Sequence, residues 1–486
     1  MVAPDSHDNK DKKMSAALGS VATATPSALS GEMIAARLDR LPASKSLWRF
    51  VTLLALGGFF ETFEMFSTSF VIPGMVRSGV LLSTTDSFFA LNGAAAYIAA
   101  TFIGLFIGTL GFGMIADKFG RRAVFTYALI GYALCSLIMA CQTGPLGLNF
   151  WRLMTAIGLG VEVIAIDAYL SELVPPTLRG RAFAINRIMS YLAVPACGIT
   201  AYLFVPHEPL GIDGWRWVIA IGAVGSLLVW VLRRKLPESA RWLADKGRLQ
   251  EADAEVSRME RAVEQETGRP LPAAIPTTKV QVEHKSSFRE LWSPRYRTRT
   301  IMLVLFHVFQ AMGIYGFLNW APTFLIEQGV TVSKSLAYTV VMGCSAPLGP
   351  ILALFFADRI ERKWQIVFGA MLIAVAGLSF AEFRVPLLII TCGGLLTMGT
   401  TILSVGYHAY QSELYPTRIR AMAVGFVYST GRLGGSLSGF MIAFAMRHFG
   451  VQSALIAVAG CMVICALSVA LLGPLTRDRT LEQIND

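Results

Sequence analysis

Long apolar runs alternate with short polar segments along most of this chain. Twelve runs hold roughly 20 or more mainly apolar residues each, the length that an α-helix needs to cross about 30 Å of hydrocarbon. The pattern argues against transmembrane strands, because these are short and alternate with a period of two. It predicts an all-α membrane protein with twelve transmembrane helices. The runs span 48–75, 87–116, 121–141, 148–173, 181–205, 216–234, 300–326, 334–357, 364–382, 385–412, 421–446 and 451–474.

Polar segments divide these runs into two sets of six. The longest polar interval between them, 235–299, contains GRLQEADAEVSRMERAVEQE, whose charge pattern is helical. The first 47 residues are polar and show no cleavable signal peptide, so we expect a cytoplasmic tail. Within it, 30–42 could form an interfacial helix with Met33, Ile34, Leu38 and Leu41 toward lipid. The expected domains are tail 1–47, bundle 48–234, linker 235–299 with amphipathic helices, bundle 300–474 and tail 475–486.

Charge is scarce but placed on one side. The chain is 54% hydrophobic and 15% charged, with a net charge of +10. If the N-terminus is inside, most basic residues of the short loops lie in cytoplasmic loops, which is the positive-inside pattern. We therefore expect cytoplasmic termini, a multi-pass cell-membrane location, a lipid environment and no nucleic-acid partner. The seven cysteines fall within predicted helices without metal-site spacing, and we expect no metal and no cofactor.

Two motifs occur once in each half of the chain. GMIADKFGRR (113–122) matches LFFADRIERK (354–363), and SELVPPTLRGRA (171–182) matches SELYPTRIRAMA (412–423). The Asp and Glu of these motifs are 55 residues apart in both halves, and one offset of 241 aligns everything. Two motifs at identical spacing predict an internal repeat, as many transporters have.

The first of these motifs resembles the cytoplasmic loop signature of the major facilitator superfamily, G-x-x-x-D-[RK]-x-G-R-[RK]. PESARWL (237–243) resembles the PESPRWL element of its sugar-porter branch, and RLMTAIGLGVE (152–162) is similar to its proton-coupled organic-acid relatives, such as nicotinate and aromatic-acid symporters. The resemblance covers essentially 45–475. The second-half loop departs from it, with Leu354 and Glu361 where the signature has Gly.

This resemblance implies a gate at the cytoplasmic ends of the helices. Acidic and basic residues of the repeated motifs would latch the two halves when the central cavity faces outward. The alternative is a positive-inside anchor with incidental pairing. The expected gating residues are Asp117, Arg121, Arg122, Glu172, Arg179, Asp358, Arg359, Glu413 and Arg420.

Acidic residues within the apolar runs of the first half need a reason, since an ionised carboxylate in hydrocarbon is costly. Four acids, Glu61, Glu64, Glu162 and Asp167, face two bases, Arg152 and Arg187. At most two simple ion pairs form, so we expect two carboxylates left over to bind protons. We expect Asp167 or Glu162 to pair with Arg187, while Glu61 and Glu64 exchange protons. Alternatively, these charges only clamp the helices together. The resemblance also implies a pair of acids three apart on the first helix.

Substrate-binding candidates lie on four predicted helices. A lone Arg near a cavity favours an anion, because guanidinium offers a bidentate fork to a carboxylate. In sugar porters the seventh helix contributes polar ligands, and this chain has HVFQAMGIYGFLNWAP there. Arg432 could be the counter-ion of the substrate or part of the cytoplasmic latch. The candidates are Arg187, Gln310, Tyr315, Asn319, Trp320, Tyr407, His408, Tyr410 and Arg432.

These features predict a secondary active transporter that carries a small organic anion with protons by alternating access. A sugar or polyol symporter and a proton-driven drug or metabolite exporter are the alternatives; a transporter-like receptor or a membrane enzyme fits less well. We find no HExxH, GxSxG or P-loop motif, so an enzyme is not expected. Apart from substrate and protons we expect no partner, and the resemblance implies a monomer.

Overall fold

The computed structural model describes residues 30–85, 87–233, 236–275, 287–356 and 360–476. Side chains are not described at 112–118, 121, 353–356, 417–418 and 421. The predicted tails up to residue 29 and from residue 477 lie outside the described residues, as do two predicted gate residues, Asp358 and Arg359.

Eleven helical segments among the described residues are long and apolar enough to cross a membrane. The last, α17, is 56 residues long, and Gly450 interrupts it with a φ of 81°. At 1.5 Å per residue α17 would extend about 84 Å, more than twice the hydrocarbon thickness, so it holds two spans. The all-helical membrane fold is confirmed, with the two parts of α17 giving the predicted twelve crossings. The helices are α3 Lys45–Arg77, α4 Ala94–Phe119, α5 Arg121–Ala140, α6 Pro145–Leu173, α7 Pro176–Phe204, α8 Gly214–Arg233, α11 Arg297–Leu318, α13 Val332–Gly343 with α14 Leu348–Phe356, α15 Arg362–Glu382, α16 Pro386–Glu413 and α17 Thr417–Leu472.

Two predicted helices are interrupted near their middle or end. The run 300–326 forms α11 and the short α12 Ala321–Glu327, with Asn319 and Trp320 between them. The run 334–357 forms α13 and α14, separated by 344–347. A proline, Pro322 or Pro347, accompanies each break, and proline lacks the N–H that a continuous helix needs. Hydropathy alone does not show these breaks, because each lies within a run that is mainly apolar on both sides.

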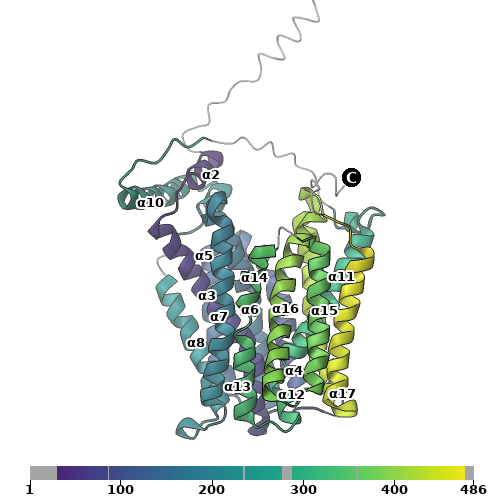
Figure 1. Ribbon diagram of the computed structural model, residues 1–486. Helices are drawn as coiled ribbons and strands as arrows, with labels where there is room; N and C mark the ends of the chain where they lie inside the picture. The colour runs from purple at the N-terminus through teal and green to yellow at the C-terminus, as the bar shows by residue number, and fades with distance from the viewer. Residues whose placement is uncertain (1–29, 86, 234–235, 276–286, 357–359, 477–486) are drawn as a thin grey trace, which may run out of the picture.

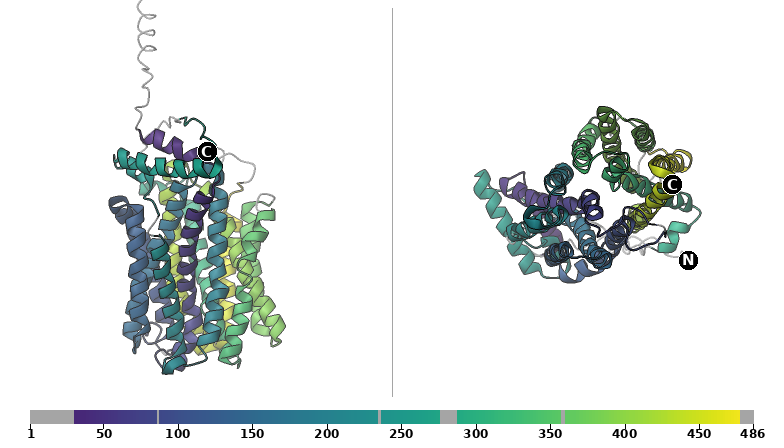
Figure 2. Two further views of the ribbon diagram at one scale, coloured as in Figure 1. Left: turned by 90° about the vertical axis from the view of Figure 1, so that its left-hand side faces the viewer. Right: turned by 90° about the horizontal axis from the view of Figure 1, so that it is seen from below.

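The helices form two groups, α3–α8 and α11–α17, which lie side by side (Figures 1 and 2). The groups meet where α4 packs against α17 and where α7 packs against α13. Glycine allows this close approach: a Cβ atom on Gly439 of α17 would lie 2.9 Å from the carbonyl oxygen of Ala95 on α4. Any site between the groups is therefore built from both halves of the chain.

A layer of short helices covers the α3–α8 group at one end, at the top of Figure 1. It contains α2 Gly31–Asp39, α9 Ala240–Asp245 and α10 Leu249–Thr267. Ile34 and Leu38 of α2 are at most 2% exposed and pack in one cluster with residues of α9 and α10, among them Trp242. The prediction that this face of α2 meets lipid is wrong, because α9 and α10 bury it instead. The 3₁₀ helix η2, Phe288–Trp292, precedes α11 within the segment expected as a linker.

Candidate substrate cavity and its charged network

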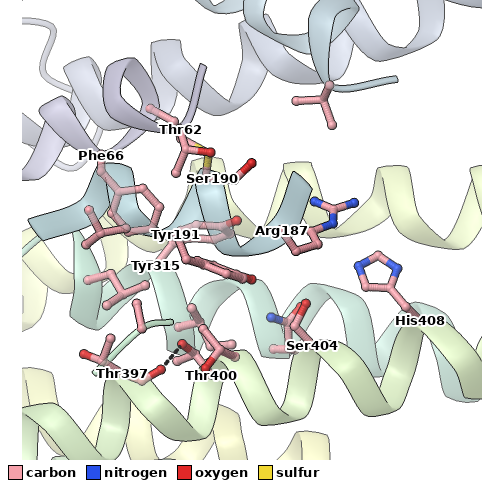
Figure 3. Close-up of a pocket in the computed structure, with 18 of the residues that line it drawn as sticks. Thr62, Phe66, Arg187, Ser190, Tyr191, Tyr315, Thr397, Thr400, Ser404 and His408 are labelled. Atoms are coloured by element: carbon pink, nitrogen blue, oxygen red, sulfur yellow. Dashed lines mark hydrogen bonds between the residues drawn. The ribbon is translucent and has the colours of Figure 1, made fainter. Parts of the chain in front are cut away.

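A cavity of about 140 Å³ lies between the two helix groups and takes its wall from both. Seven of the residues predicted from sequence to bind substrate or protons line it. Figure 3 shows Tyr191 and Tyr315 pointing into the same space, with Arg187 and His408 at one end. The structure thus brings together side chains that are up to 371 positions apart in the sequence. The seven are Glu61, Arg187, Gln310, Tyr315, Tyr407, His408 and Arg432.

Three other predicted substrate ligands do not line this cavity. Asn319 and Trp320 are 6% and 0% exposed at the break between α11 and α12. Tyr410 is fully buried and donates a hydrogen bond to the carbonyl oxygen of Pro474 at 2.8 Å. Their side chains lie on the correct helices but not on the face that meets the cavity.

Much of the polar wall was not predicted. Thr397, Thr400, Thr401 and Ser404 lie on one face of α16, at positions i, i+3, i+4 and i+7. Thr397 donates to the carbonyl oxygen of Gly393 at 2.8 Å and Thr400 to that of Thr397 at 2.6 Å (Figure 3). Because the hydroxyl protons are held within the helix, the oxygen lone pairs can accept hydrogen bonds from a substrate. The spacing of polar residues in TMGTTILS is the signal that could have identified this face.

The first of three ion pairs made by the predicted acids of the N-terminal half joins Glu64 to Arg152. Oε1 of Glu64 lies 3.5 Å from Nη1 of Arg152, and both side chains are at most 1% exposed. Ser136 donates a short hydrogen bond to the same carboxylate oxygen. Arg152 also donates to the hydroxyl of Thr101 at 2.8 Å and makes a short hydrogen bond to Thr68. This pair lies behind the cavity wall and connects α3, α4, α5 and α6.

The second pair joins Glu162 to Arg233 at 3.2 Å, with 0% and 4% of the side chains exposed. Arg233 also donates to the backbone carbonyls of Leu53 and Leu54, both at 2.8 Å. The prediction that only two arginines face the four acids is wrong, because Arg233 is a third. Arg233 is the last residue of α8, yet its side chain is only 4% exposed.

The third pair joins Asp167 to Arg187 at 3.0 Å. Arg187 therefore pairs with one of the two acids expected for it. The two side chains are 38% and 44% exposed, in contrast to the other pairs. Arg187 reaches the cavity as one half of a solvent-accessible ion pair.

Two charged side chains in the cavity wall remain outside these pairs. Glu61 is 8% exposed, and no basic group of the described residues lies within 4.0 Å of its carboxylate. Its one hydrogen bond comes from Thr62 at 3.5 Å. Arg432 on α17 is 7% exposed, and its guanidinium lies 5.4 Å from the ring centre of Tyr428. It has no carboxylate within 4.0 Å among those the structure describes.

The cavity is closed at the end opposite α2. Phe88 stacks on Phe440 with ring centres 5.8 Å apart, which joins the loop before α4 to α17. Ser69 of α3 donates to the carbonyl oxygen of Leu318 of α11 at 2.7 Å. At the α2 end, by contrast, Asp167, Arg187 and His408 are exposed. The cavity therefore opens toward α2, the end for which the charge pattern predicts a cytoplasmic location.

The predicted gate residues lie near this open end. Nη1 of Arg362 pairs with Glu413 at 2.7 Å, and Nε of Arg420 donates to the carbonyl oxygen of Tyr415 at 3.2 Å. The backbone N–H of Arg122 donates to Glu238 at 3.0 Å. Arg179 donates to the carbonyl oxygen of Val174 at 3.5 Å, and the carbonyl of Glu172 accepts from Arg241 at 3.0 Å.

These contacts all lie within one half of the chain, and at Asp117 and Arg121 only the backbone is described. A latch between the halves would form when the cavity closes at this end. That role stays a prediction.

Two six-helix groups around a central polar cavity define a membrane transporter of the major facilitator fold. The model of the Sugar (and other) transporter family matches residues 48–486, and the chain belongs to that family. It is therefore a multi-pass membrane transporter and not an enzyme.

Several bacterial proteins are similar over nearly their whole length. YyaJ of Bacillus subtilis (strain 168), which is named for metabolite transport, is 32% identical over 91% of this chain and 96% of its own. The niacin transporter NiaP of Acinetobacter baylyi is 27% identical over 93% of this chain and 99% of its own. The gallate transporter of Pseudomonas putida is 26% identical over 85% and 88%.

Among solved structures, the partially occluded inward-open xylose transporter XylE from E. coli superposes with a TM-score of 0.72. The two chains are 19% identical, and the match covers 90% of this chain and 100% of XylE. At this identity the likeness shows the fold.

Proposed function

We propose that this protein carries a small organic anion, an aromatic or other carboxylate, across the membrane together with protons by alternating access. The observation that carries the proposal is the cavity wall itself. It holds Arg432 from one half of the chain and Glu61 from the other, surrounded by tyrosine rings and hydroxyl groups. Relatives named for niacin, gallate and benzoate transport support an aromatic carboxylate. A structural neighbour named as a proton:xylose symporter supports proton coupling.

Arg432 is the side chain best suited to hold the carboxylate. Its guanidinium is always charged and offers a planar fork of donors that matches two carboxylate oxygens. Its Nε has no hydrogen-bond partner among the described residues, so a donor is available. Arg187, the other candidate, already holds Asp167. The rings of Tyr191 and Tyr315 supply flat surfaces on which an aromatic substrate can lie.

Glu61 is the carboxylate best placed to exchange a proton. It lines the cavity, whereas Glu64 and Glu162 are held behind it by Arg152 and Arg233. A buried ionised carboxylate without a cation beside it is unfavourable, so Glu61 takes up a proton through the open cavity when the substrate carboxylate occupies Arg432. We assign the proton to Glu61 and a stabilising role to the other three acids. Glu64, the second acid of the expected proton pair, becomes the alternative site.

A sugar or polyol is the second candidate substrate. The hydroxyl-bearing face of α16 from Thr397 to Ser404, with Gln310 opposite, could hold several hydroxyl groups. A neutral polyol would bring no negative charge that could pair with Arg432. The cavity wall therefore favours an anionic substrate. Comparing the binding of carboxylates with the binding of xylose decides between the two substrate classes.

A thermal-shift screen of the purified protein separates these candidates. A ligand that binds only the folded state raises the unfolding temperature by mass action. We expect nicotinate, benzoate or gallate to stabilise the protein, more strongly at acidic than at alkaline pH, since a proton binds with the anion. The neutral controls are nicotinamide, benzamide and xylose. Equal stabilisation by acid and amide would contradict anion recognition, and stabilisation by xylose alone would favour the polyol.

Proteoliposomes then test transport and coupling. We expect the stabilising carboxylate to accumulate when a pH gradient is imposed and to exchange without accumulating when the gradient is absent. Glu61→Gln should keep exchange but lose accumulation, whereas Glu64→Gln should keep both. Accumulation that survives in Glu61→Gln and disappears in Glu64→Gln would move the proton to Glu64.

A further inference from the structure

Several groups in the cavity wall can carry a charge. Most of them are either uncharged near neutral pH or balanced by an opposite charge beside them. Arg187 is neutralised by Asp167. His408 and the four tyrosines Tyr191, Tyr315, Tyr407 and Tyr428 also line the wall. Tyrosine is uncharged near neutral pH. His408 lies 3.4 Å from the amide nitrogen of Gln411, whose oxygen in turn lies 2.9 Å from His307.

Two opposite charges therefore remain, Glu61 on α3 and Arg432 on α17. They face the same cavity from different halves of the chain, and neither forms an ion pair with any residue that the structure describes. In a buried site with low dielectric, opposite charges compensate each other over longer distances than in water. Each therefore faces the other across the empty cavity as an opposite charge that has no ion-pair partner of its own among the described residues.

Building on the proposed function, we propose that Glu61 and Arg432 set the stoichiometry of transport. The substrate carboxylate neutralises Arg432, and one proton neutralises Glu61, which has lost its counter-charge. The carrier then loads one monoanion with one proton, and its net charge is the same when loaded as when empty. Transport is electroneutral.

This arrangement also suppresses incomplete cycles. An anion bound without a proton leaves Glu61 uncompensated, and a proton bound without an anion leaves Arg432 uncompensated. A buried charge without a partner is strongly unfavourable, so both states resist the closing of the cavity. The substrate class narrows accordingly to molecules with a single carboxylate. A dicarboxylate would bring a second negative charge for which the wall holds no second free cation among the described residues.

The charge movement can be measured in proteoliposomes, with radiolabelled nicotinate as the first probe and benzoate and gallate as the next. A potassium gradient with valinomycin imposes a membrane potential, and a trapped pH indicator reports protons. We expect a pH gradient to drive accumulation, a potential of either sign to have no effect, and one proton to enter per anion. Accumulation driven by the potential alone, or another ratio, would overturn the proposal.

A double-mutant cycle tests the Glu61–Arg432 relationship without any substrate. Glu61→Gln and Arg432→Gln should each lower the unfolding temperature, because each leaves the other charge uncompensated. The double variant should lose clearly less than the sum of the two losses. The matched control is Arg216→Gln combined with Glu61→Gln, whose losses should add, since Arg216 pairs with Asp213 and does not line this cavity.

The transport experiment and the double-mutant cycle distinguish a failure of the proposed function from a failure of the present inference. If none of the three carboxylates is transported, the proposed function fails, while coupling in the cycle still supports the charge relationship. If a carboxylate is transported but Glu61 and Arg432 show additive effects, only the present inference fails. Arg432→Lys keeps the charge and should resemble the wild type in the cycle, which separates charge from side-chain shape.

Discussion

Gly57 of α3 lies directly under the guanidinium group of Arg233 of α8. A Cβ atom on Gly57 would lie 1.5 Å from Nη2 of Arg233. Arg233 cannot move aside easily, because Glu162 and the carbonyl oxygens of Leu53 and Leu54 hold it. The glycine thus makes room for the second buried ion pair, and this close approach joins α3, α6 and α8.

Gly57→Ala should therefore destabilise the protein by about 1–3 kcal/mol, the usual range for overpacking a filled interior. Thermal unfolding of the purified variant measures the loss. The matched control is Gly131→Ala on α5, since a Cβ atom on Gly131 meets nothing within 4 Å. Alanine favours helix over glycine, so the control should be neutral or slightly stabilising. Equal stability of the two variants would contradict the packing described for Arg233.

Arg152→Gln should leave Glu64 buried without a cation and destabilise the protein by about 3–5 kcal/mol. The double variant with Glu64→Gln should recover much of this loss, because no ionised carboxylate then remains. Arg187→Gln is the comparison: its pair with Asp167 is about two-fifths exposed, and exposed pairs contribute only about 0–1 kcal/mol. Urea or thermal unfolding of the three variants gives the order of their stabilities. If Arg187→Gln lost more stability than Arg152→Gln, burial would not be what determines the contribution of these ion pairs to the free energy of unfolding.

The helices and the repeat could be predicted from the sequence, because apolar runs of membrane length and a fixed motif spacing are local or one-dimensional signals. The partners of the acids could not. Arg233 was not among the bases expected to face these acids, because hydropathy gives neither the depth nor the direction of a side chain. Asn319 and Trp320 were expected in the cavity because they lie on the right helix, but the helix break turns them away.

The same limit explains the error over α2. Its apolar face was correctly located at Ile34 and Leu38, yet an amphipathic pattern does not say what covers that face. Lipid and a neighbouring helix are equally apolar partners. Only the tertiary arrangement brings α10, more than 200 residues later in the sequence, against α2.

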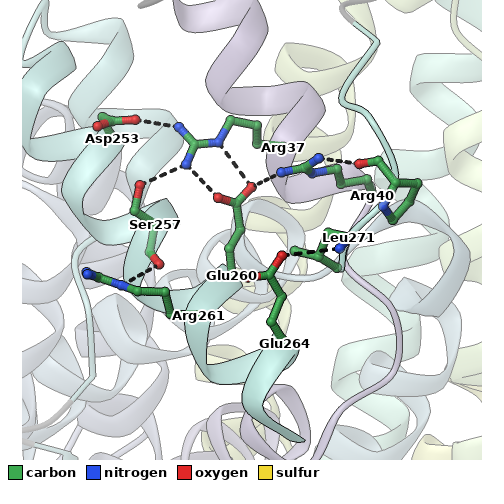
Figure 4. A network of polar contacts seen from close by, with 9 residues as sticks. Arg37, Arg40, Asp253, Ser257, Glu260, Arg261, Glu264 and Leu271 are labelled. Atoms are coloured by element: carbon green, nitrogen blue, oxygen red, sulfur yellow. Dashed lines mark hydrogen bonds and ion pairs between the residues drawn. The ribbon is translucent and has the colours of Figure 1, made fainter. Parts of the chain in front are cut away.

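Docking of α2 should resist mild acid and weaken only in strong acid. Glu260 of α10 accepts hydrogen bonds from Arg37 and Arg40 of the α2 segment (Figure 4). Burial acts to raise the pKa of Glu260, but these hydrogen bonds outweigh it and lower the pKa below its ordinary 4.5. A lowered folded-state pKa means that the contribution to stability is complete above about 4.5 and is lost as pH falls through the folded-state value.

Hydrogen exchange of residues 31–39 across a pH series, corrected for the intrinsic rate, measures this docking. Protection should stay constant down to about pH 4.5 and then fall. Glu260→Gln should reduce protection at neutral pH and remove the acid transition. Glu251→Gln is the matched control, since Glu251 is exposed and its one ion pair among the described residues is with Arg248, three positions before it. Loss of protection between pH 5 and pH 7 would contradict the role of Glu260.

A larger side chain at Gly439 should favour the opposite state of the transporter. The cavity is closed away from α2 where α17 lies on α4, and a Cβ atom at Gly439 already comes within 2.9 Å of a backbone oxygen. A clash of about 1.4 kcal/mol shifts the equilibrium between two states about tenfold. In Gly439→Leu, a cysteine at Thr400 should become less reactive toward a maleimide added from the α2 side and more reactive from the other side. Gly460→Leu is the matched control, because a Cβ atom there meets nothing within 4 Å. Unchanged labelling in Gly439→Leu would mean that the contact between α4 and α17 is not what closes the cavity at this end.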